Sequence, residues 1–371
     1  MTELQKLVLD ISKSSGDLFD ILSKDPYCFD IKHSEDCYML SFTKDSDISK
    51  TPIRQANGTI FEKETNKILH FSFSKCYEGI ENFTDETNVS YIRDVFSLET
   101  LKNMNKIKID IEEYVEGSII KLYYHRDKWN IATSRSIEAD KNYWGSESSF
   151  RDIFFDIVGY DFLESLDSRF FYTYILQHPK LHSLLGVTEP RVKILCKVNR
   201  ENLTEQRFVN LLKKTLEEAM FDVKNFEVNY MVYINTDSEC IRIKLLNDTY
   251  LRGRNLLGNT PNIFLRYIEL MSLGDINSLS LIKQKFPHFT KKFHVIQILF
   301  HKTCIDILNS YHIRYTNGDF STQVNKNHWI TVNQLYSDFL NDNKKVSYGT
   351  VKKKLLSLYP KTLAKVIGFR V

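Results

Sequence analysis

Arg242 and Lys244 are two basic residues in a stretch, residues 240–244, that is predicted to be a β-strand. Alternate residues of a strand point to the same face, so both side chains should lie on one face of a sheet. Two fixed positive charges of this kind suit the binding of phosphate groups, although a solvated strand face would have the same pattern. A second stretch, residues 114–118 with the sequence YVEGS, is either an ordinary turn between two predicted strands or part of a site.

Residues 111–140, with the sequence IEEYVEGSIIKLYYHRDKWNIATSRSIEAD, resemble the nucleophile segment of phage and giant-virus RNA ligases. In that family a lysine, a variable residue, an acid, Gly and Ser precede a strand hairpin, and the lysine amine attacks the α-phosphate of ATP. Glu116, Gly117 and Ser118 match this order, but Tyr114 stands at the lysine position. A phenol with a pKa of about 10 is a poor nucleophile at neutral pH, and because it has no nitrogen it cannot form the phosphoramidate. The resemblance therefore implies a ligase-like protein that cannot make ligase-AMP.

Further segments resemble the same family in the same order, and their departures fall on its functional positions. The basic pair Arg242 and Lys244 is kept, and the resemblance implies that it holds nucleotide phosphates. Residues 251–271 and 348–367 resemble the family's link to its C-terminal domain and its closing helix. In the segment 55–79, Asn57 stands where the family has an arginine. In the segment 171–192, Ile175 stands where it has a glutamate, and Gln177 and His178 are the polar groups that remain. Val228 and Asn229 stand where it has a Glu-Gly pair.

The changed positions are those of the family's catalytic and nucleotide-binding residues, whereas the segments that build its fold are kept. This predicts a catalytically degenerate RNA ligase-like protein that binds RNA ends or tRNA-like loops, in RNA repair or in protection such as immunity to an RNA-cleaving toxin of a virus-like element. The resemblance implies ATP with Mg²⁺ as cofactor. It places Tyr114 and Glu116 at the catalytic positions and Asn57, Gly117, Ser118, Gln177, Arg242 and Lys244 at the nucleotide-binding positions. A phosphate track is predicted from Arg135, Arg252, Arg254, Lys352 and Lys353, with Lys193 and Lys354 beside them, and base stacking from Tyr123, Tyr124, Trp129 and Trp144.

Two other functions fit the same residues. An active ATP-dependent RNA ligase would need Lys75, Lys121 or Lys244 as a substitute nucleophile. A structural subunit of a viral or plasmid replication and transcription complex would need no RNA affinity of its own. The sequence does not separate this last function from RNA binding.

The elements that must position these residues follow from the hydrophobic patterns. Strands come first and helices last, which predicts an α+β protein with an RNA ligase-like nucleotidyltransferase domain of antiparallel sheets at 1–254 and a helical C-terminal domain at 255–371. Strands are expected at 38–42, 58–61, 68–73, 107–113, 118–125, 129–134, 170–176, 191–198, 227–234 and 240–244. One or two short helices are expected within 3–23, and further helices at 149–166, 205–220, 261–271, 276–285, 291–310, 331–341 and 350–367.

Composition sets limits on the class of protein. The 371 residues are 42% hydrophobic, which is enough for a sizeable core, and the net charge of +3 permits nucleic-acid binding without requiring it. None of the six cysteines has CxxC spacing, so a zinc site is not expected, and no residue is assigned as a metal ligand. Without a signal peptide or an apolar run of membrane length, a cytoplasmic protein is expected.

Overall fold

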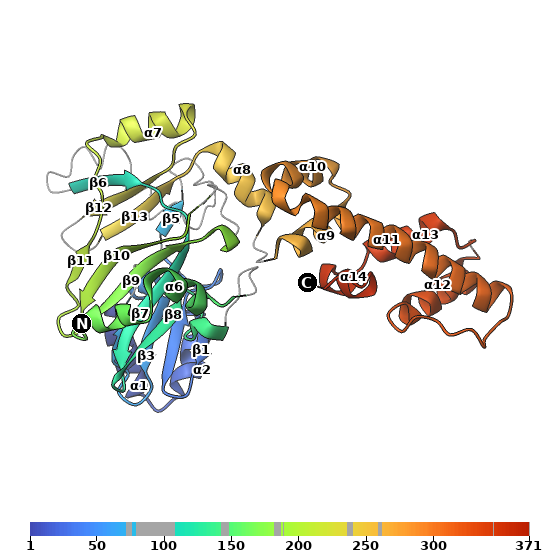
Figure 1. Ribbon diagram of the computed structural model, residues 1–371. Helices are drawn as coiled ribbons and strands as arrows, with labels where there is room; N and C mark the ends of the chain where they lie inside the picture. The colour runs from blue at the N-terminus through green and yellow to red at the C-terminus, as the bar shows by residue number, and fades with distance from the viewer. Residues whose placement is uncertain are drawn as a thin grey trace. The chain divides into compact units, whose positions relative to one another are not determined.

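The computed structural model describes residues 1–71, 76–78, 108–141, 148–181, 187, 189–235, 240–258, 262–343 and 345–370. It is a mixed α+β protein in which mainly antiparallel sheets are followed by C-terminal helices (Figure 1). The chain divides into two compact units, Met1–Leu251 and Arg252–Val371. The division falls inside helix α8 (Asp248–Leu257), and the boundary expected after residue 254 lies in the same helix.

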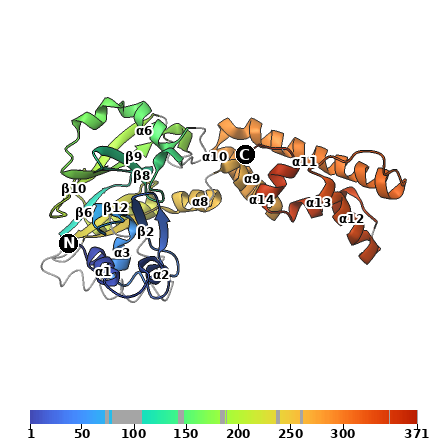
Figure 2. The same ribbon diagram turned by 90° about the horizontal axis from the view of Figure 1, so that it is seen from below.

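The first sheet has the order β1-β2-β3-β4 and its neighbours are antiparallel. Helices α1, α2 and α3 gather beside it (Figure 2). They bury Leu4, Val8 and Leu22 with Tyr38 and Phe61 of the strands. The elements are α1 (Glu3–Ser12), α2 (Leu18–Ser23), β1 (Asp30–His33), β2 (Cys37–Ser41), α3 (Thr51–Gln55), β3 (Asn57–Glu62) and β4 (Ile68–His70).

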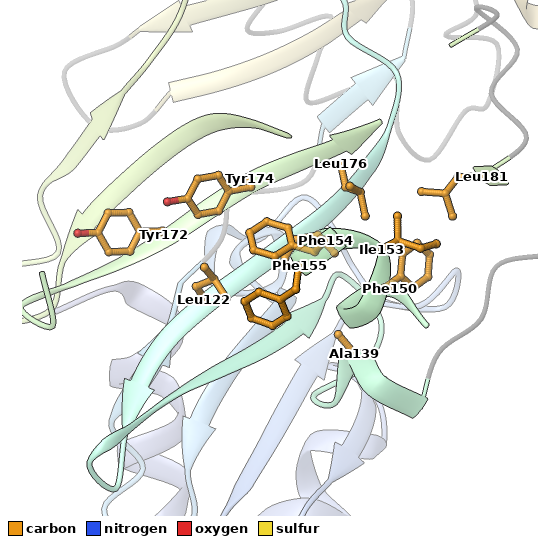
Figure 3. Packing of buried hydrophobic residues seen from close by; sticks show 11 residues of the cluster. Leu122, Ala139, Phe150, Ile153, Phe154, Phe155, Tyr172, Tyr174, Leu176 and Leu181 are labelled. Atoms are coloured by element: carbon orange, nitrogen blue, oxygen red, sulfur yellow. The ribbon is translucent and has the colours of Figure 1, made fainter. Parts of the chain in front are cut away.

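The central sheet has the order β11-β10-β9-β7-β8 and is covered on both faces. On one face, Phe154 of helix α6 packs edge to face on Tyr174, within a cluster that also holds Phe150 and Leu122 (Figure 3). On the other face, side chains such as Phe171 pack against the first sheet. The elements are β7 (Ser118–His125), β8 (Lys128–Thr133), α6 (Phe150–Val158), β9 (Phe170–Gln177), β10 (Arg191–Asn199) and β11 (Glu205–Arg207).

The third sheet has the order β5-β13-β12-β6, and its two faces differ in chemistry. Ile111, Val232 and Ile243 are paired in register, and their face is covered by helix α7. The alternate residues, including Glu112 and Lys244, therefore point to the opposite face. The elements are β5 (Cys76–Glu78), which is parallel to β13, β6 (Lys108–Glu113), α7 (Leu216–Asn225), β12 (Tyr230–Asn235) and β13 (Cys240–Leu245).

The second unit is helical in its described residues. Its core includes Tyr267 and Phe293, whose rings stack with centroids 4.5 Å apart. No helix among the described residues is both long and apolar enough to cross a bilayer. The elements are α9 (Ile263–Leu273), α10 (Ile276–Lys285), α11 (Thr290–Tyr311), a π-helical turn (His312–Thr316), α12 (Trp329–Asp342), α13 (Tyr348–Leu356) and α14 (Pro360–Val366), and short 3₁₀ turns lie at Ala139–Lys141, Asp161–Ser165, Pro179–Leu181 and Pro287–Phe289.

Three expected helices were wrong in extent. The helix expected at 205–220 begins only at Leu216, where Thr215 and Glu218 form a capping box, and Glu205–Arg207 is instead strand β11. The helix expected at 149–166 ends at Gly159, whose positive φ of 79° stops it. The helix expected at 350–367 is two helices, because Pro360 cannot donate the backbone hydrogen bond that continuity requires.

Candidate functional site

The turn at residues 114–117 connects β6 of the third sheet to β7 of the central sheet. The backbone N–H of Tyr114 donates to the carbonyl oxygen of Asn229 at 2.9 Å, and Ser118 pairs with Leu176 on β9. A Cβ atom on Gly117 would lie 2.6 Å from the Leu176 carbonyl oxygen. Only glycine fits there without a shift of β9, so the turn is held tightly against both sheets.

Side chains around this turn fix Glu116 and bring a second phenol beside Tyr114. Gln177 Nε2 donates to the Glu116 carbonyl oxygen at 2.9 Å, and the Tyr250 hydroxyl donates to Glu116 Oε1 at 3.1 Å. The rings of Tyr114 and Tyr250 meet edge to face at 5.8 Å. Burial, together with the adjacent Tyr114 and Glu116, raises the pKa of Tyr250, so its hydroxyl stays protonated as a donor. The sequence analysis did not single out Tyr250.

Lys244 extends from β13 to the same place. Its Nζ lies 5.6 Å from the centroid of the Tyr114 ring and 3.7 Å from Glu78 Oε1 on β5. The structure therefore brings together the position of the expected nucleophile and one member of the basic pair. An ammonium group beside a half-buried phenol ring can bind an anion, and the phenol itself supplies no amine.

Arg242, the other member of the basic pair, is 8% exposed and lies in a layer of charged groups. Its guanidinium is 3.7 Å from Glu205 Oε1 and 5.6 Å from the centroid of the Tyr233 ring. The Tyr233 hydroxyl in turn donates to Glu112, which is 6% exposed. Lys193 Nζ, on β10, is 3.9 Å from Glu112 Oε2. This charged layer joins the polar face of the third sheet to β10 and β11.

The sequence reasoning had missed the acidic and aromatic members of this layer. The signal was present in residues 108–112, KIDIE, where charged and apolar residues alternate. Alternation shows that Glu112 shares a face with Asp110 and opposes Ile111. It does not show that this polar face is covered, because Lys193 and Glu205 come from β10 and β11, two strands of another sheet.

Asn57 and Arg135 form a separate group around Lys121. Lys121 is fully buried, and its Nζ donates to the carbonyl oxygens of Gly58 at 2.6 Å and Asn57 at 3.2 Å. Burial, and then the charge of Arg135, lowers the pKa of Lys121 to about 7. Gly58 has a positive φ of 71°, and a Cβ on it would lie 2.4 Å from the Ser134 carbonyl oxygen. An amine enclosed in this way cannot reach a nucleotide, so the idea of Lys121 as a substitute nucleophile was wrong.

The remaining predicted residues are dispersed. Tyr123 is 2% exposed and lies in the core, so the prediction that it stacks on bases was wrong. Trp129 packs edge to face on Tyr124 at 5.5 Å. Arg252, Arg254, Lys352 and Lys353 belong to the second unit, where Lys354 pairs with Asp338 at 2.9 Å. Lys75 and Trp144 lie outside the described residues. Within the described ranges, no three His, Cys, Asp or Glu side chains lie together as a metal site requires.

The fold and the site thus define an α+β protein in which the turn at residues 114–117 places Tyr114 beside Lys244 of the third sheet. No family model matches the sequence. The chain is homologous to proteins named immediate-early protein ICP-46 homolog. It is 26% identical over 271 residues to that of Invertebrate iridescent virus 3, covering 68% of this chain and 58% of the relative. It is 26% identical over 285 residues to that of Invertebrate iridescent virus 6, covering 66% and 61%.

The chain spans about three fifths of the length of these viral relatives. Among solved structures, an archaeal ATP-dependent RNA ligase is similar at a TM-score of 0.38 and 7% sequence identity. That similarity covers 76% of this chain and 73% of the archaeal chain.

Proposed function

We propose that this protein is a catalytically degenerate RNA ligase-like nucleotidyltransferase that binds RNA ends or tRNA-like loops. The observation that carries the proposal is the placement of Tyr114 beside Lys244, with the ammonium group 5.6 Å from the ring centroid. In a working member of the resembled family, a lysine would stand at this position next to the basic pair. Here a phenol stands there instead, so the proposed site keeps a means of holding phosphate and lacks the group that accepts AMP.

The polar side chains around Tyr114 are arranged to bind a ligand and include no nucleophile at the position of the family's lysine. The Lys244 side chain is 27% exposed, so a phosphate can approach its ammonium group even though that group forms an ion pair with Glu78. Glu116 is oriented by Tyr250 and Gln177 through its carboxylate and its carbonyl. For ATP with Mg²⁺, Lys244 is the residue that would contact the phosphates, and Arg242, which is 8% exposed and paired with Glu205, would add its charge from behind. The acids of the charged layer are already paired with cations and hydroxyls.

We expect the protein to bind RNA without forming a covalent bond to AMP. With labelled ATP and Mg²⁺, the wild-type protein should carry no covalent AMP after denaturing electrophoresis. A short single-stranded RNA should still bind, and its affinity should fall steeply as salt is raised, because phosphate contacts release counterions. Covalent AMP on the protein would refute the degenerate-enzyme proposal. Lack of binding to any RNA at low salt would refute the RNA-binding part.

An active ligase is the second candidate, and of the two described lysines Lys244 is better placed than Lys121 to be its nucleophile. Lys121 is enclosed, whereas the amine of Lys244 is beside the expected nucleophile position. Recovery of a Lys244–AMP peptide by mass spectrometry would establish this candidate. Sealing of pre-adenylylated RNA without that peptide would show that only the last step of ligation survives.

The biological role is proposed from the same reasoning. On a virus or a virus-like element, a binder of RNA ends would protect or sequester RNA, including RNA cut by a toxin. If the protein is instead a structural subunit of a replication and transcription complex, it should co-purify with a polymerase or a capping enzyme and show no RNA affinity of its own.

A further inference from the structure

Arg314 lies among aromatic rings in the second unit. Its Cζ atom is 4.5 Å from the ring centroid of Trp329, 4.9 Å from that of Phe320 and 5.9 Å from that of Tyr315. We call these four residues the Arg314 cage. Arg314 and Tyr315 belong to the π-helical turn His312–Thr316, which follows α11. Insertions of this kind in a helix are frequent at functional sites.

The charge of Arg314 is not neutralised within the described part of the chain. Its Nε atom is buried and has no hydrogen-bond partner there, and no described carboxylate forms an ion pair with it. Asp319, the nearest acid in the sequence, is engaged elsewhere. Its carboxylate accepts hydrogen bonds from the hydroxyls of Ser321 at 2.6 Å and Thr322 at 2.7 Å. A planar guanidinium in this state suits an anion such as phosphate or carboxylate.

The rings of the cage differ in how they are held. Tyr315 is fixed, because its ring stacks on Tyr336 at 3.9 Å and its hydroxyl donates to Asn333 Oδ1 at 2.6 Å. Phe320 and Trp329 are not enclosed, and they are 61% and 40% exposed. Exposed aromatic rings beside a cation are the combination that binds single-stranded nucleic acid, since a base can stack while its phosphate pairs with the cation.

We propose that the Arg314 cage binds one nucleotide of single-stranded RNA. The base stacks on Trp329 or Phe320, and the flanking phosphate pairs with Arg314. The proposal rests on the proposed function, because it assigns part of the RNA contact to the second unit. An acidic peptide could pair with the guanidinium as well, but its carboxylate would leave both exposed rings without a stacking partner. A nucleotide uses the guanidinium and at least one exposed ring together.

The test compares RNA affinity between variants of the full chain by fluorescence anisotropy with a labelled single-stranded oligoribonucleotide. Arg314→Gln and Phe320→Leu should each weaken binding about tenfold, as expected for loss of a phosphate contact or a stacked base. Two matched controls, Lys291→Gln and Tyr359→Leu, alter an exposed cation and an exposed aromatic of the same unit that have no place in the cage. These controls should bind RNA like the wild type, and circular dichroism checks that every variant is folded.

A second measurement reports stacking directly. The chain has three tryptophans, so Trp129→Phe combined with Trp144→Phe leaves Trp329 as the only indole. Its fluorescence should be quenched by RNA and not by polyglutamate.

Unchanged affinity in the cage variants, with no quenching while the wild type binds RNA, would overturn the cage and leave the proposed function standing. Quenching by polyglutamate and not by RNA would also overturn the cage, in favour of an acidic peptide. If the wild type binds no RNA even at low salt, the proposed function and the cage are both refuted.

Discussion

Replacing Lys121 with methionine should remove a pH-dependent part of the protein's stability. The folded-state pKa of Lys121 is about 7, below its ordinary 10.5, because the amine is fully buried. Between pH 7 and 10.5 the folded protein therefore holds fewer protons than the unfolded chain. The free energy of unfolding of the wild type then rises with pH in this window, by up to about 1.4 kcal/mol for each pH unit. Below pH 7 both states are protonated, and this contribution is absent.

Urea unfolding of the wild type and of Lys121→Met at several pH values between 6 and 10 would measure this effect. The difference between their free energies of unfolding should favour the wild type increasingly as pH rises from about 7. Lys213→Met is the matched control, because Lys213 is exposed and its replacement should give a difference that does not depend on pH. A constant difference for Lys121→Met would show that the buried amine keeps its proton, contrary to the pKa given above.

Replacing Lys244 with glutamine should weaken RNA binding and reduce its dependence on salt. If the ammonium group contacts a phosphate, its loss should cost about 2 kcal/mol, or roughly a thirtyfold loss of affinity. The slope of log affinity against log salt should also become shallower by about 0.7, the value for one contact to a single strand. Anisotropy titrations of a 5′-phosphorylated oligoribonucleotide at several salt concentrations would measure both quantities.

Lys213→Gln provides the control for this experiment. Lys213 is an exposed lysine just before α7, the helix that covers the apolar face of the same sheet, opposite Lys244. Its replacement removes the same charge from the protein and should leave affinity and salt slope nearly unchanged. Equal effects of the two replacements would indicate attraction by overall charge, and would count against a site at the Tyr114 turn.

The sequence was sufficient to predict most strands of the first unit and most helices of the second. Strand β7 was expected at its observed bounds, Ser118–His125, because its length and its flanking turns are local properties. Helix α10 was likewise expected at Ile276–Lys285. Prediction failed where local signals conflict, as at residues 205–220. A helical periodicity there continues across β11, whose three residues are held as a strand by pairing with β10.

The surroundings of the candidate site could not be read from local patterns. Tyr250 reaches Glu116 across 134 positions of the chain. Alternation along β7 sets Lys121 and Tyr123 on one face, but it cannot tell whether that face is exposed. The central sheet is covered by α6 on one side and by the first sheet on the other. Lys121 and Tyr123, which the sequence offered for chemistry and for stacking, are therefore buried.

By itself, the sequence determined that residue 114 is a tyrosine and not a lysine, that Arg242 and Lys244 share one strand face, and that strands precede helices. These follow from residue identity and from the period of two along a strand. Only the tertiary structure decided which cations remain accessible. Accessibility depends on which sheet or helix covers each face, and on carboxylates such as Glu205 that distant strands bring to a cation.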